Sequence, residues 1–295
     1  MNLKIMRLVL RVHYSSVPAA PPEEPDGVRL TVDRGPQIPR RPAGSRLRRG
    51  LAYHPGLRLD LLLPVTAGPH PLVVYVPGGG FVVAPRRMAR RQRAYVAAAG
   101  YAVASVEYRA TRQQAIYTDG IADIQNAITY LSDHADEYAI DPGRIGIWGE
   151  SAGGYLASLA GLTDPRIRAV VDQFGASDLS RAADGFDPRM QQAVTDPRHP
   201  IYRYGALRCN PADLVHAAAP PFLLLHGDDD RIITPAQTGV LHRALLASGA
   251  DSTRYVLAGA GHGQLSLTRR QARQWTSVQV MTTITDFLSQ QLRGT

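Results

Sequence analysis

A serine in the run Gly149-Glu150-Ser151-Ala152-Gly153 has the surroundings of a nucleophile. An apolar run at residues 144–148 precedes it, and a stretch of small residues begins at Ala152. A G-x-S-x-G sequence between a strand and a helix forces a sharp turn that exposes the serine hydroxyl, with small neighbours because backbone segments approach closely there. A serine hydroxyl is a weak nucleophile, so Ser151 requires an adjacent base that a carboxylate orients.

Two later segments supply that base and that carboxylate. His262 lies in a glycine-framed loop after the last expected strand, and the run Asp228-Asp229-Asp230 follows the strand before it. The chain order Ser, Asp, His is the one that accompanies the G-x-S-x-G turn. We assign His262 as the base and Asp230 as its carboxylate, and we interpret Asp228 and Asp229 as turn and helix-capping residues.

Acyl chemistry at Ser151 also requires N–H groups that bind a developing oxyanion. The run Pro77-Gly78-Gly79-Gly80-Phe81 follows an apolar stretch, and its glycines allow the main chain to approach a substrate carbonyl. Glycine triplets also form plain turns, but this one precedes the first expected crossover helix. We therefore predict that the N–H groups of Gly79, Gly80 and Ala152 form the oxyanion hole.

Apolar runs alternate with amphipathic stretches from residue 51 onward, which predicts strands and helices in turn. The expected strands are 57–63, 72–76, 102–106, 144–148, 169–174, 222–225 and 253–257, and the expected helices are 86–99, 119–138, 152–162, 235–247 and 275–292. This alternation predicts an α/β fold with a doubly wound, mainly parallel sheet and helices on both faces.

One stretch, residues 177–219, holds no strand-like run and predicts a small cap-like insertion over the carboxyl ends of the strands, where ligands bind in open α/β sheets. We expect the substrate pocket to be walled by Phe81 and by residues of this insertion, namely Tyr202, Tyr204 and Leu207. The acyl and alcohol groups of a substrate do not follow from these residues.

With these motifs in place, the chain resembles the α/β-hydrolase esterases and lipases of the hormone-sensitive-lipase and BD-FAE type. The resemblance runs from about Tyr53 to the C-terminus and includes Glu107-Tyr108-Arg109, residues 140–145 and residues 174–179. It implies the α/β-hydrolase fold and a serine esterase that cleaves a small-molecule carboxylic ester through an acyl-enzyme, with neither cofactor nor metal.

The chain departs from this family at Pro77, where the oxyanion motif usually begins with histidine. Proline cannot donate the side-chain hydrogen bonds that help to hold the loop, although Gly79 and Gly80 keep their N–H groups. Two alternatives therefore stay open on the same fold. One is acyl transfer, or elimination of a carboxylate from an O-acylated intermediate, and the other is a binding protein without turnover.

Composition and charge exclude other classes. The 295 residues are 44% hydrophobic and 20% charged, which excludes a wholly disordered chain, and no apolar stretch reaches the roughly 20 residues of a membrane span. Of the net charge of +8, residues 1–50 contribute ten basic and four acidic residues, a difference of +6. We interpret residues 1–50 as a basic Pro/Arg-rich arm and 51–295 as the hydrolase domain.

The arm carries no aromatic residue among its clustered arginines, Arg40 to Arg49, so we expect no nucleic-acid partner. The single cysteine, Cys209, forms no internal disulfide and lies at no metal-ligand spacing. We therefore expect a cytoplasmic protein, and we leave the oligomeric state open.

Overall fold

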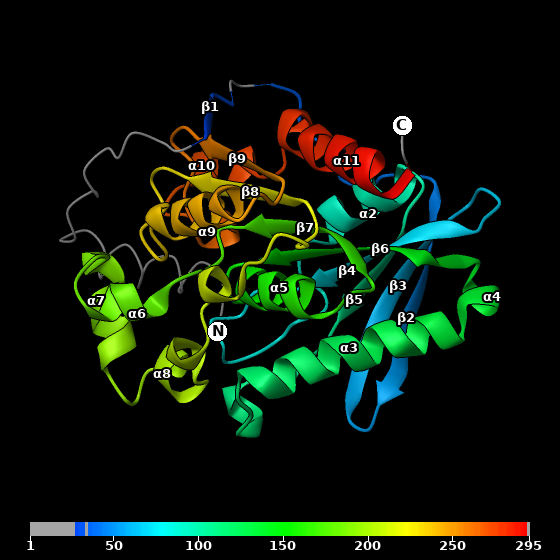
Figure 1. Cartoon of the computed structure of the whole chain (residues 1–295). Helices are drawn as coiled ribbons and strands as arrows, with labels where there is room; N and C mark the ends of the chain where they lie inside the picture. The colour runs from blue at the N-terminus through cyan, green and yellow to red at the C-terminus, as the bar shows by residue number, and fades with distance from the viewer. Residues whose placement is uncertain (1–26, 33–34, 294–295) are drawn as a thin grey trace.

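The computed structural model describes residues 27–32 and 35–293. Within them, a nine-stranded sheet has the order β1-β9-β8-β7-β6-β4-β5-β3-β2 (Figure 1). Among these strand pairs only β2–β3 and β3–β5 are antiparallel. The strands are β1 (Val28–Leu30), β2 (Ser45–His54), β3 (Leu57–Pro64), β4 (His70–Val76), β5 (Ala102–Val106), β6 (Ile140–Glu150), β7 (Ile167–Gln173), β8 (Phe222–Gly227) and β9 (Ser252–Leu257). The predicted α/β fold with a mainly parallel sheet is confirmed.

Helices cover both faces of the sheet. On one face lie α3 (Tyr117–Asp133), α5 (Ala152–Thr163) and α9 (Ala236–Ala247), and on the other lie α2 (Arg90–Ala98) and α11 (Val278–Arg293). Successive side chains of a strand point to opposite faces, and β4 accordingly sends Val74 into the first core and Val73 into the second. Both faces are buried, so the central strands are continuous apolar runs.

Shorter helices complete the chain. After β5 come η1 (Thr111–Gln113) and, beyond α3, α4 (Ala135–Tyr138), while η4 (Gly263–Leu265) and α10 (Arg269–Gln274) follow β9. The segment between β7 and β8 contains α6 (Leu179–Ala183), α7 (Pro188–Thr195), α8 (Pro200–Arg203), η2 (Ala206–Arg208) and η3 (Pro211–Leu214). Figure 1 shows α6, α7 and α8 grouped at one end of the molecule.

The segment predicted as an N-terminal arm differs from that expectation where it is described. β1 adds a parallel edge strand to β9, Ile38 is fully buried, and β2 begins at Ser45, so the expected boundary at residue 50 falls inside a strand. The reason is that β2 is an edge strand whose side chains are all exposed or only partly buried. Charged residues are typical of such edges, and they resemble a linker in composition. Residues 1–26 of the predicted arm lie outside the described residues.

No helix in the described part of the chain combines the length and the apolar character that crossing a bilayer requires.

Candidate active site

Three predicted residues come together at the carboxyl ends of the strands. Ser151 lies between β6 and α5, Asp230 follows β8, and His262 follows β9. The Oγ of Ser151 is 2.8 Å from Nε2 of His262, and Nδ1 of His262 is 2.7 Å from Oδ2 of Asp230. The three side chains thus form one continuous hydrogen-bonded chain, the arrangement that lets an imidazole take a proton from a serine hydroxyl.

The turn that carries Ser151 is strained and tightly packed. Ser151 has φ 57° and ψ −123°, outside the conformations that non-glycine residues usually adopt. A Cβ at Gly149 would lie 2.1 Å from the carbonyl oxygen of Gly153, and one at Gly153 would lie 2.1 Å from that of Val76. The flanking glycines are therefore required by backbone proximity, and the turn holds the hydroxyl at the start of α5.

Asp230 is fully buried, and both of its carboxylate oxygens have hydrogen-bond partners. Its Oδ1 accepts the N–H groups of Ile232 and Ile233, while Nε2 of His226 lies 3.5 Å from Oδ2. Burial alone would raise the pKa of Asp230, but the charge of His262 and hydrogen bonds from both histidines outweigh it and hold that pKa well below its usual range. The carboxylate therefore stays ionised and orients the His262 ring.

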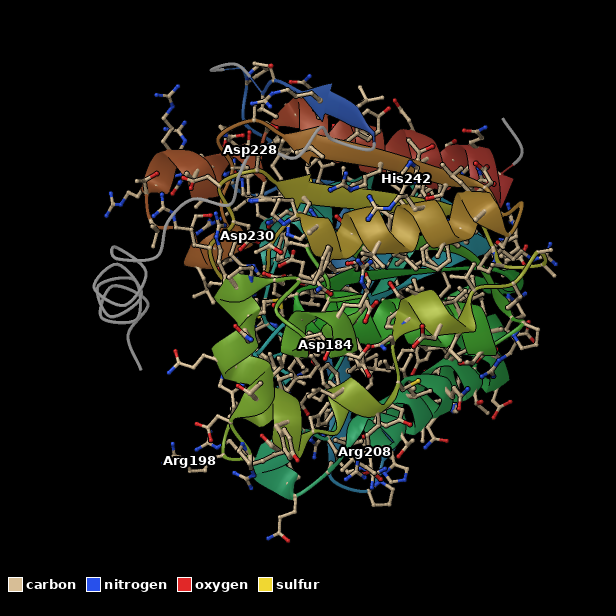
Figure 2. The ribbon with its side chains drawn as sticks, turned by 60° about the vertical axis from the view of Figure 1, so that its left-hand side comes forward. Asp184, Arg198, Arg208, Asp228, Asp230 and His242 are labelled. Carbon is tan, nitrogen blue, oxygen red and sulfur yellow. The ribbon has the colours of Figure 1, made fainter. Side chains whose placement is uncertain are left out.

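The insertion also reaches this carboxylate loop. Arg189 of α7 donates a hydrogen bond to the backbone carbonyl of Asp230. Figure 2 places Asp230 between the insertion helices and the strand ends, with Asp228 farther toward the sheet edge. Sequence reasoning missed both Arg189 and His226 as partners of Asp230. Neither carries a local signal, although His226 lies four residues before the aspartate.

The neighbouring aspartates are occupied elsewhere. Asp228 pairs with Arg29 of β1, and Asp229 pairs with Arg231 and accepts a hydrogen bond from Gln271 of α10. The structure brings only Asp230 of the three to His262, which agrees with the interpretation of the other two as turn and capping residues.

The glycine loop after β4 is anchored at several points. The hydroxyl of Tyr108 donates to the carbonyl of Pro77 at 2.8 Å, and Thr111 donates its N–H and its hydroxyl to the carbonyl of Phe81. Gly80 and Phe81 both have positive φ, 62° and 61°. Tyr108 thus holds a loop that lacks the usual histidine.

This geometry leaves the predicted donors available. In the described part of the chain, neither Gly79 nor Gly80 donates its N–H to another protein group. Ala152 is the first residue of α5, where an N–H has no partner inside the helix.

Of the four residues predicted to wall the pocket, two are buried in the core and the other two are only partly covered. Phe81 and Tyr204 are buried against each other, with ring centroids 5.3 Å apart, and Tyr204 donates its hydroxyl hydrogen to the carbonyl of Arg109. Tyr202 is 46% exposed, and Leu207 is half-buried. Two of the four thus pack in the core that joins the insertion to the sheet, where neither ring faces open space.

A pocket of about 580 Å³ instead lies beside the triad. It is bounded by Glu150, which precedes Ser151, and by Gly263, which follows His262. The ring of Phe174 stands between His262 and Trp275, with centroid distances of 4.7 Å to each. The remaining lining residues are Pro85, Arg87, Met88, Ala89, Arg90, Arg91, Gln92, Gln173, Gln264, Ala272 and Thr276. Of this wall, the sequence indicates only the arginine-rich run after residue 85, which it favours as solvated helix surface; the aromatic residues Phe174 and Trp275 carry no such signal.

Glu150 is the acidic group of this pocket. Burial raises its pKa to about 7, against the opposing influence of His262 and Arg93. Near neutral pH this carboxyl group is therefore partly protonated, unlike the ionised Asp230.

Comparison with known proteins identifies the family. The BD-FAE family model matches residues 59–245, which hold the glycine loop, the serine turn and the aspartate. The chain belongs to the BD-FAE family. His262 lies beyond the matched range, and its place at Ser151 comes from the geometry above.

Curated relatives of this BD-FAE member include three proteins of two organisms. A probable carboxylic ester hydrolase, LipM of Mycobacterium tuberculosis, is 32% identical over 61% of this chain and 45% of its own length. Esterase LipC of the same organism is 30% identical, over 66% and 53%. An isoprenylcysteine alpha-carbonyl methylesterase of Arabidopsis thaliana is 26% identical, over 76% and 58%. The chain spans about half the length of the curated relatives it matches.

Solved structures share the fold of this BD-FAE member. A truncated carbohydrate esterase from gut microbiota superposes with a TM-score of 0.70 at 24% identity, covering 88% of this chain and 99% of that one. A bacterial heroin esterase gives 0.66 at 22% identity, with coverage of 85% and 86%. At such identities the similarity establishes the α/β-hydrolase architecture.

Proposed function

We propose that this BD-FAE member hydrolyses carboxylic esters of small molecules through Ser151 and an acyl-enzyme intermediate. The observation that carries the proposal is the hydrogen-bonded chain from Ser151 through His262 to Asp230, beside available backbone N–H groups. The names of the curated relatives LipM and LipC, a probable carboxylic ester hydrolase and an esterase, support the same reaction class.

The residues divide the reaction as follows. The Ser151 oxygen attacks the ester carbonyl while Nε2 of His262 takes the hydroxyl proton, and Asp230 holds the opposite N–H of the imidazolium. The N–H groups of Gly79, Gly80 and Ala152 bind the oxyanion. His262 then gives the proton to the departing alcohol, and a water molecule, deprotonated by the same imidazole, releases the acid and restores the serine. No step uses a metal or a cofactor.

A fluorophosphonate probe tests this proposal without a choice of substrate. We expect the probe to phosphonylate Ser151 alone, as located by peptide mass spectrometry, because its hydroxyl bonds a histidine that Asp230 orients and lies beside available backbone N–H groups. The adduct should be lost in Ser151→Ala and in His262→Ala, and it should persist in Ser248→Ala, which changes a serine that bonds within its own helix. A folded protein without an adduct, or an adduct that survives Ser151→Ala, contradicts the proposal.

The alternatives on the same fold differ in their products. Hydrolysis leaves an alcohol, acyl transfer leaves a new ester, and elimination of the carboxylate leaves an alkene. A binding protein without turnover forms none of these products and no adduct with the fluorophosphonate probe. The hydrogen bond from Tyr108 to Pro77 favours acyl-enzyme chemistry over binding without turnover, because it holds the oxyanion loop without the usual histidine. We also propose that the protein is cytoplasmic, because its single cysteine cannot form an internal disulfide and therefore suits a reducing compartment.

A further inference from the structure

The first crossover begins with an unusual concentration of arginines, at positions 86, 87, 90, 91 and 93. Two of them hold the protein together. Arg86 pairs with Asp60 and Glu107, and the buried Arg93 donates to two backbone carbonyls. The other three, Arg87, Arg90 and Arg91, line the pocket beside the triad.

The charges of these three arginines are not matched by carboxylates. Among the described residues no Asp or Glu forms an ion pair with Arg87, Arg90 or Arg91, and the Nε–H of Arg91 bonds the backbone carbonyl of Pro39. Burial, followed by the charges of Arg40 and Arg273, lowers the pKa of Arg91, so two further segments add positive charge at this rim.

The helix itself makes this charge less favourable. α2 begins at Arg90, has no acidic residue in its first turn, and has no side-chain cap at Ala89. The N-terminus of a helix carries a partial positive charge, which favours acidic side chains and repels cations. Arginines at these positions therefore oppose the helix dipole, and an anion at the rim would relieve both repulsions.

The rest of the pocket connects this rim to the reacting bond. Glu150 and Gly263 adjoin the nucleophile and the base, and the Phe174 ring lies against His262. Phe174, Trp275 and Met88 supply apolar lining to the same pocket as the arginines. Glu150, the one acidic residue of this lining, is itself buried, and burial raises its pKa to about 7. An ester whose apolar chain carries a carboxylate at its far end would match these apolar and cationic lining residues.

We propose that the site selects esters that carry a second, anionic group, a carboxylate, which Arg87 and Arg90 bind at the pocket rim. The inference rests on the proposed ester hydrolysis at Ser151 and names the substrate class of that site. The carboxylate belongs either to the acyl part or to the alcohol part of the ester, and the same rim serves both.

Two matched pairs of esters separate these sources. Monomethyl glutarate and its neutral amide, methyl 4-carbamoylbutanoate, place the group on the acyl side. 4-Acetoxybutanoate and 4-acetoxybutanamide place it on the alcohol side. We expect kcat/KM at about pH 6.5, where Glu150 is mostly protonated and the ligand carboxylate is ionised, to favour the anion by about tenfold or more in one pair; pH-stat titration follows the reaction. Added salt at about 0.5 M should reduce that preference, because it screens exposed charges.

The double variant Arg87→Gln/Arg90→Gln should reduce the ratio of kcat/KM between the anionic and the neutral ester of that pair to within about twofold, because it removes the charge that distinguishes the two esters. The control Arg46→Gln/Arg168→Gln removes the same charge from exposed positions near the other end of the sheet and should keep the preference.

Two outcomes overturn the inference. One is a preference below about twofold in both pairs, or no turnover of either anionic ester. The other is equal loss in the two double variants, which would indicate a general field effect. If the neutral amides are hydrolysed and Ser151 is labelled by the fluorophosphonate, the proposed ester hydrolysis stands while the inference fails. Absence of both labelling and turnover rejects the proposed function itself.

Discussion

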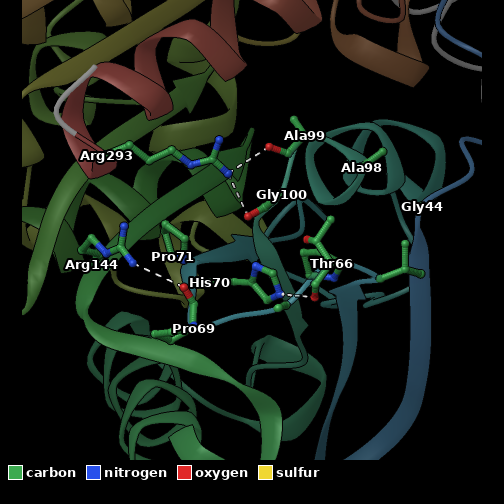
Figure 3. A pocket seen from close by; sticks show the side chains of 13 residues that line it. Gly44, Thr66, Pro69, His70, Pro71, Ala98, Ala99, Gly100, Arg144 and Arg293 are labelled. Carbon is green, nitrogen blue, oxygen red and sulfur yellow. Dashed lines mark hydrogen bonds between the residues drawn. The ribbon is translucent and has the colours of Figure 1, made fainter.

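The two ends of the sheet each hold a pocket lined by arginines, yet they use that residue in opposite ways. The pocket opposite the triad has a volume of about 450 Å³ and lies where β4 and β5 begin (Figure 3). There Arg293 donates to the carbonyls of Ala99 and Gly100, and Arg144 pairs with Asp141. At the end that holds Ser151 and His262, the described structure leaves Arg87 and Arg90 without a carboxylate. Arginine joins chain segments at one end and offers charge to a ligand at the other.

The strand β6 shows the same contrast within one element. Near its beginning, burial of Asp141 is outweighed by hydrogen bonds from Arg144 and Gly143, and the pKa of this carboxyl lies below its usual value. At its end, burial raises the pKa of Glu150 to about 7. One carboxylate is therefore held charged by its partners, whereas the other is kept partly neutral beside the nucleophile. Asp141 is stabilised in its charged form by a paired arginine, whereas the buried Glu150 next to Ser151 has a raised pKa, and such shifts are common at functional sites.

The largest difference between the two ends of the sheet is expected for kcat when a glycine of the oxyanion loop is replaced. A Cβ on Gly79 would lie 1.7 Å from the carbonyl oxygen of Val83, so Gly79→Ala must displace the loop and its N–H donors. We expect kcat for a neutral ester to fall about 10²- to 10³-fold, the typical loss for one oxyanion donor.

Gly143→Ala is the matched glycine change at the other end, where the new Cβ meets only the Asp141 carboxylate, at 3.2 Å. This variant should keep its kcat. Equal losses in the two variants would show that the loop after β4 has no special catalytic role.

A smaller effect is expected from pH, with opposite signs at the two ends of β6. Because the folded pKa of Glu150 is raised from 4.5 to about 7, the folded state holds this proton more tightly. Its contribution to stability is therefore full below about pH 4.5 and is lost as pH rises toward 7, by about 3 kcal/mol at most. Glu150→Gln should remove this fall from the free energy of unfolding measured in urea at several pH values.

Asp141→Asn provides the comparison for that series. The folded pKa of Asp141 is lowered, so its contribution is present above the unfolded pKa of 3.8 and is lost only as pH falls below that value. The Asn variant should therefore retain the fall between pH 4.5 and 7. If Glu150→Gln retains it as well, burial of Glu150 is not its source.

The smallest effect would sharpen the comparison of arginines. Arg293→Met keeps the apolar stem but removes the bonds to the carbonyls of Ala99 and Gly100, and we expect the free energy of unfolding to fall by about 1 kcal/mol. Arg90→Met should change it by less than about 0.5 kcal/mol, because Arg90 has no described hydrogen bond or ion pair to lose. Urea unfolding measures both, and a larger loss in Arg90→Met would assign that arginine a structural role.

Most of the sheet and the triad could be predicted because their signals are local. A strand of the central sheet is a continuous apolar run, and the Ser151 turn is determined by glycines within two residues of it. Asp230 and His262 follow strand ends, and parallel strands bring their carboxyl ends to one edge.

The edge strands were missed for a physical reason. β1 and β2 gain their hydrogen bonds from strands distant in sequence, while solvent accepts their arginines. Their composition therefore resembles that of a linker, and only pairing with β9 and β3 distinguishes them.

What the sequence by itself determined is a set of reactive residue types, namely a serine, a histidine and an aspartate, and the order of elements that carries them. What only the tertiary structure decided is the pocket. Phe81 and Tyr204 turn into the core, while Phe174, Trp275 and the arginines at the start of α2 line one pocket from separate segments. Reactive groups are specified by neighbours along the chain, whereas a pocket wall depends on which faces pack together across it, and that choice follows from long-range burial.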